Sequence, residues 1–512
     1  MIDNTVIPMM NRFDLLMFMR GVGLEVTNGD KARAESRKVG PFQNLQGDYL
    51  TETICNLNLS DQPEMRGLDY IFSDTLHFAD DPVELAGQYW DRIAEGGWLI
   101  LAVPDPEYSP KPGHFGAPPE WKAHPDIDAI LKFEGSEEAT MFVGQFRRGP
   151  FVWELWAIGK NPKYVPRIPR PGEIVVVRLG AFGDHLWSSS LFPALKLKKN
   201  PHQGGWSPLI YMTNDKGYEV TLHDPNVEGT VVWTEGQLKP EMMWDFMDWV
   251  NVRWPEAVHL NYEAETRLLF PPACVSHKHP DSVRRQLAAG NYVEWLGFIA
   301  GVEPGPVLFH ASEDERQWAQ GLLEPLGPGP IFGIVIHGSS VNKFWPHMPA
   351  LVVRLMHKIP EARFVIFGEG AGAKDAADHL FTSVGRFVEA GAEDRFLNMV
   401  DRTNIREAMS LANECDVVIA PETALLNAVS YNEQVFKVAL LSHSTVENLT
   451  KGWPNTASFA ARGLGCYPCH RIHFDWTWCN KSPDGAWAMC QELISPDAVE
   501  GVILAHLGAQ EG

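Results

Sequence analysis

Two short segments of the sequence combine residue types that can bind an anion. The first follows the apolar run 174–177 and reads RLGAFGD from Arg178 to Asp184. Glycines such as Gly183 in a strand-to-helix turn let the backbone approach a ligand closely, and a helix N-terminus favours an anion. The same pattern also fits a tight turn in which Asp184 only adds an acidic residue to the start of a helix. The residues alone leave both interpretations open.

The second segment follows the apolar run 331–336 and reads HGSSVNKFWP from 337 to 346. Ser339 and Ser340 offer hydroxyl groups, and Lys343 offers a cation, just past the carboxyl end of a predicted strand. Hydroxyl and backbone donors together with one cation suit a phosphate group. A polar loop with a solvated lysine is the alternative interpretation.

Four of the seven cysteines lie within 25 residues of one another. One pair has the CxxC spacing of a zinc half-site, but the other two are widely spaced, so the match to a four-cysteine zinc site is partial. His470 and His473 could substitute as ligands. Reduced, partly buried thiols are one alternative, and a disulfide or a catalytic cysteine are others. The four residues are Cys466, Cys469, Cys479 and Cys490.

Composition narrows the class of protein. Of the 512 residues, 45% are apolar and 21% are charged, and the formal net charge is −22. This is typical of a globular protein, and the acidity argues against a general binder of nucleic acid or anionic membranes. We expect no membrane span, because no apolar run reaches about 18 residues. The N-terminal segment lacks the basic region of a signal peptide, and the few cysteines fit a cytoplasmic protein.

Short β-rich runs alternate with amphipathic stretches along the chain, which predicts an α/β fold. Four prolines between 161 and 172 indicate a linker, because such a segment can form neither a helix nor a central strand. A second break, rich in proline and glycine, lies at 324–330. At about 150 residues per domain, the breaks predict three units. We expect one unit at 1–160, the linker at 161–172, and two further units at 173–323 and 324–512.

Between about residues 173 and 508 the chain resembles the glycosyltransferase family 9 enzymes, the ADP-heptose:lipopolysaccharide heptosyltransferases. The segment 178–184 matches the strand-R-L-x-x-x-G-D signature, and 337–346 resembles the hydroxyl-and-lysine loop with its K-x-W-P ending. Further likenesses are the turn at 224–227, the helix and strand at 404–418, and the tail at 466–469 and 494–496. Each motif is short, but they occur in the order typical of the family.

This resemblance implies a GT-B architecture, in which two Rossmann-like domains face each other across a cleft. It implies inverting, metal-independent transfer from a nucleotide-diphosphate sugar, ADP-heptose-like, that is held mainly by the C-terminal domain. Asp184 matches the family's general base, which takes the proton of the attacking hydroxyl. The residues implied to lie at the donor are Gly183, Ser339, Ser340, Lys343, Glu422 and Thr423.

The donor turn departs from the family pattern D-[ST]-G-x-x-H. This chain reads ETALLN from Glu422 to Asn427, so only Thr423 is retained unchanged. Ala424 adds a Cβ where backbone can approach the diphosphate, and Asn427 replaces a possible cation. These differences bear directly on which donor is used and on whether transfer is retained.

Over about residues 20–160 the chain resembles the class I S-adenosylmethionine-dependent methyltransferases. The likeness rests on 68–82, a central strand with its turn, and on 93–100, a helix–Gly-Gly–strand element. A retained cofactor site for S-adenosylmethionine (SAM) would use Glu25, Gly29 and Asp48, the last at the ribose hydroxyls. Thr27 stands where the family has a glycine, and a branched residue hinders close approach. We therefore expect a degenerate methyltransferase fold that serves docking or acceptor presentation.

The sequence as a whole predicts an enzyme, a glycosyltransferase with a nucleotide sugar as donor substrate. The acceptor is left open between a glycan, a lipopolysaccharide core and a modified nucleic-acid base. Two alternatives come from other classes of function. One is a bifunctional methyl- and glycosyltransferase, and the other is a non-catalytic scaffold or structural protein that retains both folds.

Overall fold

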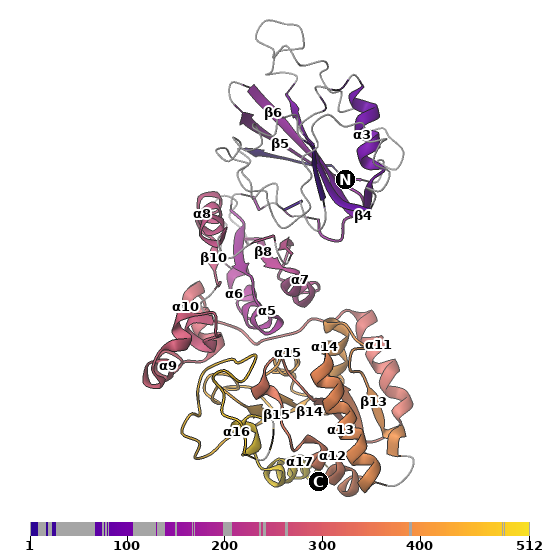
Figure 1. The fold of residues 1–512 in the computed structure, drawn as a ribbon, viewed down its shortest axis with the longest axis vertical. Coiled ribbons are helices and arrows are strands. Elements are labelled where there is room, and N and C mark those ends of the chain that lie inside the picture. The colour runs from indigo at the N-terminus through magenta and orange to yellow at the C-terminus, as the bar shows by residue number, and fades with distance from the viewer. Residues whose placement is uncertain are drawn as a thin grey trace, which may run out of the picture. The chain divides into compact units, whose positions relative to one another are not determined.

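The structure, a computed structural model, shows three α/β sheets with their helices (Figure 1). By contacts the chain groups into two compact units, one of residues 1–171 with 229–256 and one of residues 172–228 with 257–512. The residues that the structure describes are 2–8, 17–18, 23–26, 67–73, 76, 79, 81–105, 130, 139–148, 151–165, 167, 169–170, 172–197, 207–234, 237–238, 242–261, 265–388, 392–483, 485 and 487–510.

The first sheet has the strand order β1-β5-β6-β4-β3-β2. Its strands pair in parallel except β6, which is antiparallel to both β4 and β5. Helix α3 begins after Asp81, whose side chain accepts hydrogen bonds from the backbone N–H groups of Val83 and Glu84. The elements are β1 (Ile2–Pro8), β2 (Gly23–Val26), β3 (Leu68–Ser73), α3 (Pro82–Trp90), β4 (Ile93–Pro104), β5 (Thr140–Arg148) and β6 (Phe151–Gly159).

The second sheet has the order β10-β7-β8-β9, and β7 pairs in parallel with both β10 and β8. Strand β7 (Ile174–Arg178) is buried from Val175 to Arg178, as expected for a central parallel strand. The other elements are α5 (Phe182–Ser189), α6 (Phe192–Lys196), β8 (Leu209–Asn214), α7 (Asp215–Thr221), β9 (Gly229–Trp233), α8 (Met243–Arg253), β10 (Val258–His259), the π-helical turn η5 (Glu265–Leu269), the 3-10 turn η6 (Val275–Lys278), α9 (Asp281–Leu287), α10 (Tyr292–Ala300), α11 (Glu313–Leu323) and the 3-10 turn η7 (Glu324–Leu326).

The third sheet is entirely parallel, in the order β13-β12-β11-β14-β15-β16. Numbered in chain order from β11, the strands lie in the order 3-2-1-4-5-6, which is the Rossmann order. The order in which successive strands are added to the sheet reverses between β11 and β14, although all strands run parallel. Its elements are β11 (Ile331–Val335), the 3-10 turn η8 (Val341–Lys343), α12 (Met348–Lys358), β12 (Arg363–Phe367), α13 (Ala371–Phe387), the 3-10 turn η9 (Ala392–Arg395), β13 (Phe396–Asn398), α14 (Ile405–Asn413), β14 (Val417–Pro421), α15 (Ala424–Ala428), β15 (Phe436–Leu441), β16 (Thr456–Ala460), α16 (Met489–Glu492) and α17 (Pro496–Gln510).

Helices cover both faces of the third sheet, so alternate residues of each strand meet different cores. Ile334 packs in the same core as Leu351 of α12, and α12 lies against α13 and α17 (Figure 1). The neighbouring Val335 belongs to the other core, which also holds Met409 of α14. This core includes Val176 of β7 and residues of α5. The α/β class predicted from the sequence is confirmed. The domain borders predicted at 161–172 and 324–330 stay predictions.

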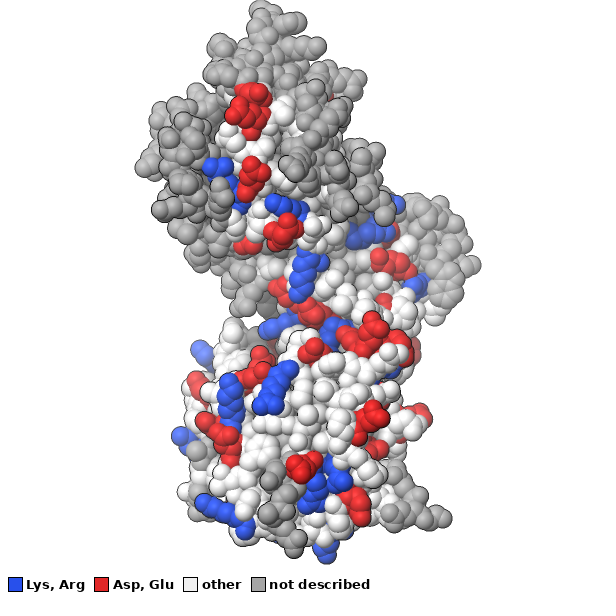
Figure 2. Space-filling model, turned by 90° about the vertical axis from the view of Figure 1, so that its right-hand side faces the viewer, with Lys and Arg blue, Asp and Glu red and all other residues white. Residues whose placement is uncertain are grey.

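Charges of both signs share the surface. On the face in Figure 2, Lys and Arg side chains are interspersed with Asp and Glu among the described residues. In the part of the chain that the structure describes, none of the helices combines the length and the apolar character needed to cross a membrane.

Arg406 connects three segments of the second unit. From α14 its guanidinium binds both carboxylate oxygens of Glu315, at 2.6 and 2.7 Å, and donates to the carbonyl oxygens of Glu219 and His310, at 2.6 and 2.8 Å. Glu315 also closes a capping box with Ser312 at the start of α11. Replacing this buried side chain therefore leaves one carboxylate and two carbonyl groups without their partner.

We predict that Arg406→Met lowers the free energy of unfolding by about 3 kcal/mol, the lower end of the range for breaking a buried ion pair, because Glu315 is partly exposed to water. Urea denaturation followed by circular dichroism measures it. Arg316→Met is the matched control, because Arg316 pairs with Glu313 on the surface of α11, and its urea midpoint should stay close to that of the unchanged protein. Equal midpoints for the two variants would contradict the role given to Arg406.

Candidate active site

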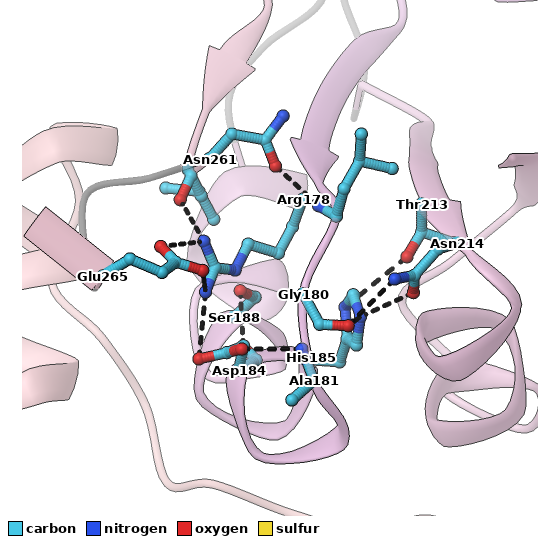
Figure 3. A network of polar contacts seen from close by, with 12 residues as sticks. Arg178, Gly180, Ala181, Asp184, His185, Ser188, Thr213, Asn214, Asn261 and Glu265 are labelled. Carbon is cyan, nitrogen blue, oxygen red and sulfur yellow. Dashed lines mark hydrogen bonds and ion pairs between the residues drawn. The ribbon is translucent and has the colours of Figure 1, made fainter. Parts of the chain in front are cut away.

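Asp184 is held in place from two sides. It is the third residue of α5, and its Oδ2 accepts a hydrogen bond from the backbone N–H of Ala181 at 2.7 Å (Figure 3). Its Oδ1 lies 2.9 Å from Nη2 of Arg178, the last residue of β7. Gly180 makes room for this arrangement, because a Cβ there would lie 2.7 Å from Asp184 Oδ2. The predicted turn at 178–184 therefore fixes a carboxylate that is only 6% exposed.

Arg178 is shared between two carboxylates. Besides Asp184 it binds Glu265 of η5 with both terminal nitrogens, Nη1 to Oε2 at 3.0 Å and Nη2 to Oε1 at 2.8 Å, and Nη1 also donates to the Leu260 carbonyl at 2.8 Å. Burial alone would lower the pKa of Arg178, but the charges of Asp184 and Glu265 outweigh it and raise that pKa. The guanidinium is therefore permanently charged, and it faces two acids.

His185, next in the chain, has a structural role. Its Nδ1 lies 2.6 Å from the Tyr211 hydroxyl, and its Nε2 lies 2.9 Å from Asn214 Oδ1 and 3.1 Å from the Gly180 carbonyl. Burial lowers the pKa of His185 to about 4, so the ring is neutral at pH 7. Sequence reasoning did not single out His185 or Glu265, and only the position of His185 directly after Asp184 offered a signal.

The predicted residues of the third sheet follow the carboxyl ends of β11 and β14, where the strand order reverses. Open α/β sheets bind ligands in this crevice. Gly338 packs closely against Lys343 and Thr423. A Cβ on Gly338 would lie 2.7 Å from Lys343 Cβ and 3.2 Å from Thr423 Cγ2. Burial lowers the pKa of Lys343, while the nearby charges of Glu422 and Asp184 act in the opposite direction. The structure thus brings Asp184, Lys343 and Glu422 into one charge cluster.

Glu422 is bound entirely by groups of the protein. Its Oε2 accepts from the Ser442 hydroxyl at 2.5 Å and from the His443 backbone N–H at 3.2 Å, and the His443 ring Nε2 lies 3.1 Å away. Its Oε1 accepts from the backbone N–H of Ser444 at 3.1 Å and from the Ser444 hydroxyl. Burial alone would raise the pKa of Glu422, but His443 and these hydroxyls lower it, so the side chain is an anion at neutral pH.

Ser340 and Ser339 differ in their surroundings. The Ser340 hydroxyl is buried and donates to Asn342 Oδ1 at 2.5 Å, and Asn342 Nδ2 donates to the Ser442 hydroxyl at 3.1 Å. Ser340 thereby belongs to the hydrogen-bond chain that ends at Glu422. Ser339 is exposed, so its hydroxyl is accessible to a ligand.

Three buried polar atoms in or beside this cluster have no hydrogen-bond partner in the described part of the chain. They are Thr423 Oγ1, Asn427 Oδ1 and His443 Nδ1. Asn427 also faces α5, because a Cβ on Gly183 would lie 2.9 Å from Asn427 Nδ2. Native proteins satisfy nearly all such groups, so atoms like these indicate where a ligand or an ordered water can bind. The available groups of this site include Lys343, Thr423, Asn427, His443 Nδ1 and Ser339.

The four clustered cysteines line one cavity of about 70 Å³, together with Arg284 and Arg471. All six cysteines in the described segments are free thiols. Burial, together with neighbouring thiols, raises the pKa of Cys469 to about 12 and of Cys479 to about 11. Among the described residues, no three His, Cys, Asp or Glu side chains are arranged to hold a metal ion. The zinc site therefore stays a prediction from the spacing.

Of the three residues predicted to bind SAM, only Glu25 lies in the part of the chain that the structure describes. Gly29 and Asp48 lie outside the described residues, and Glu25 is described only as backbone in β2.

The sequence matches no family model and no curated protein. Among solved structures, the chain is similar to a glycosyltransferase family 9 protein from Veillonella parvula, with 13% identity and a TM-score of 0.44 over 68% of this chain and 100% of that one. It is also similar to ADP-heptose lps heptosyltransferase II from E. coli, with 15% identity and a TM-score of 0.45 over 66% and 100%. A smaller part, 28% of this chain and 86% of the other, is similar to a SAM-dependent methyltransferase from Aquifex aeolicus, with 14% identity and a TM-score of 0.19. Proteins of both families that the sequence resembles are among these similar structures.

Proposed function

We propose that this chain is a glycosyltransferase that moves a sugar from a nucleotide-diphosphate sugar to an acceptor hydroxyl. The observation that supports it most is the close packing at the predicted site: a Cβ on Gly183, next to Asp184, would lie 2.9 Å from Asn427 Nδ2, and one on Gly338 would lie 2.7 Å from Lys343 Cβ. A carboxylate that can take a proton lies near a cation that can hold a phosphate. The available polar atoms of Thr423 and Asn427 lie beside them.

Asp184 is proposed as the general base. It accepts the proton of the acceptor hydroxyl while that oxygen forms a bond to the anomeric carbon from the side opposite the leaving group. The bond from that carbon to the phosphate oxygen breaks, its electron pair leaves with the nucleoside diphosphate, and the configuration is inverted. As the sequence resemblance implies, the proposed transfer is metal-independent: Asp184 takes the proton, and fixed donors of the protein stabilise the leaving diphosphate.

Lys343 is proposed to stabilise the departing diphosphate. Negative charge builds up on the leaving group, and fixed donors in a water-poor site stabilise it more than bulk water does. Ser339 and Thr423 would add hydroxyl donors, and Gly183 lets backbone approach the ligand. Glu422 and Ser340 are occupied by their own hydrogen bonds, so we assign them to the support of the site and not to contact with the donor.

The finer assignments rest on the sequence resemblance. We propose an ADP-heptose-like donor and, as acceptor, a glycan, a lipopolysaccharide core or a modified nucleic-acid base. We propose that the methyltransferase-like unit predicted at 1–160 presents the acceptor and does not methylate it. We also propose that the protein acts in the cytoplasm, where free thiols persist. A structural zinc ion at the four clustered cysteines remains part of the proposal.

We predict that ADP-heptose and ADP raise the thermal unfolding midpoint of the full chain. A ligand at about 100 times its Kd stabilises the folded state by about 2.7 kcal/mol. Lys343→Met should abolish most of this response because it removes the cation of the site. Lys358→Met, on an exposed part of α12, is the matched control and should respond like the unchanged protein. Differential scanning fluorimetry measures all three.

The same thermal-unfolding measurement, with SAM added as a third ligand, separates the proposed function from the two alternatives. A response to SAM as well as to ADP-heptose would favour the bifunctional enzyme. A chain that responds to none of the three ligands would favour the scaffold and contradict the proposed function.

We predict that Asp184→Asn lowers the rate of sugar transfer by about 100-fold or more, since a general base contributes about 10²–10⁴-fold. Binding of ADP-heptose should be nearly unchanged. Release of ADP from ADP-heptose measures turnover, and isothermal titration calorimetry measures binding. Asp314→Asn is the control, because it removes an exposed acid from the first turn of another helix, α11. Full turnover by Asp184→Asn would show that another group is the base.

A further inference from the structure

The way Arg178 divides its contacts between two carboxylates is uneven. Glu265 receives both terminal nitrogens of the guanidinium, whereas Asp184 receives only Nη2 (Figure 3). Each Asp184 oxygen therefore accepts one hydrogen bond from the protein, Oδ1 from Arg178 and Oδ2 from the backbone of Ala181. A carboxylate has about four lone-pair positions, so both oxygens keep room for a further donor.

We propose that Glu265 is a positioning residue for sugar transfer: by holding Arg178 with both its oxygens, it keeps the guanidinium from pairing fully with Asp184. The inference rests on the proposed function, because it assumes that Asp184 must receive the proton of the acceptor. Arg178 orients Asp184 through one contact, and Glu265 prevents a second contact that would occupy the oxygens the acceptor needs.

The chemistry of the guanidinium makes this competition strict. Arginine presents five donors in a rigid planar fork, and the edge formed by Nη1 and Nη2 can hold only one carboxylate in the bidentate arrangement. Arg178 is 1% exposed, so it cannot turn to water if it loses a partner. Its remaining contact, from Nη1 to the Leu260 carbonyl, is neutral and offsets none of its charge. Without the negative charge of Glu265, Asp184 becomes the only carboxylate that Arg178 contacts among the described residues.

Glu265 itself can be switched by pH. Burial and the charge of Asp184 raise the pKa of Glu265 above its usual value, although Arg178 opposes the shift. As the pH falls, Glu265 therefore takes up a proton earlier than an ordinary glutamate and loosens its hold on Arg178. The described titratable groups whose pKa is influenced by the charge of Glu265 or Asp184 are Arg178, His185, Tyr211, Cys274, Tyr292 and Lys343.

Glu265→Gln tests the proposal on the full chain, with ADP release from ADP-heptose as the probe. We expect kcat to fall by about 10- to 100-fold, as misplaced reacting groups cause, with KM for ADP-heptose unchanged. The acidic limb of the pH–rate profile should move to lower pH, because the group that protonates early has been removed. Glu265→Asp keeps the charge and should recover most of kcat. Glu313→Gln is the control, since it changes a surface glutamate that also binds an arginine, with one oxygen accepting from Nε and Nη2 of Arg316.

A crystal structure of Glu265→Gln gives a second measurement that needs no turnover. We expect both terminal nitrogens of Arg178 on Asp184, where the unchanged protein has one. A retained single contact, or a wild-type kcat and pH profile, would overturn the inference. Loss of activity only in proportion to unfolded protein would also overturn it, because that is a structural role.

Failure of the proposed function has a different signature. Full turnover by Asp184→Asn, or no ADP release by the unchanged protein, contradicts the proposed function. The crystal structure of Glu265→Gln still decides whether Glu265 controls Arg178.

Discussion

The second unit depends on one buried cation. At the end of β7, Arg178 binds Asp184 of α5, the Leu260 carbonyl after β10 and Glu265, the first residue of η5. Glu265 lies 87 positions from Arg178 in the chain. A guanidinium removed from water must be compensated, and removing one partner of such a pair typically costs about 3–5 kcal/mol. The geometry of Asp184 is therefore set by a constraint on folding as much as by any ligand.

The same constraint explains how a strongly acidic chain can offer a site for an anion. The cluster holds two cations, Arg178 and Lys343, against three carboxylates, Asp184, Glu265 and Glu422. Glu265 and Glu422 each have their negative charge offset by protein groups. The backbone of Lys343 is hydrogen-bonded to Ser340 and Gly338, but its Nζ has no hydrogen-bond partner among the described residues, so its charge remains for a ligand. With two cations against three carboxylates the cluster is itself acidic, so a site for an anion here depends on the cation of Lys343.

Local signals explain which parts could be predicted from the sequence. Apolar runs bounded by glycine turns predict β7 and β11 and the segments that follow them, and parallel strands place those segments at one edge of their sheet. Local signals of this kind selected Lys343, whereas Asp184 as the base and Glu422 at the donor turn followed from the resemblance to glycosyltransferase family 9. The linear pattern contains no information on which of them still have free polar atoms.

The missed parts depend on long-range pairing. Asn342 meets Ser442 across 100 positions of sequence, and Glu265 meets Arg178 across 87. No local period or motif encodes such contacts, because they follow from how the finished elements pack. Ser340 illustrates the difference, since its residue type suits a phosphate and its position commits it to Asn342.

The hydrogen bonds of Glu422 have a consequence for the kinetics of recognition. They fix the loop after β15 through Ser442, His443 and Ser444 with the chain's own groups. A ligand that enters beside Lys343 does not have to order this loop, so it loses little conformational entropy of the protein on binding. Association then resembles docking to a rigid surface, and differences in affinity between related ligands reside mainly in how fast they leave.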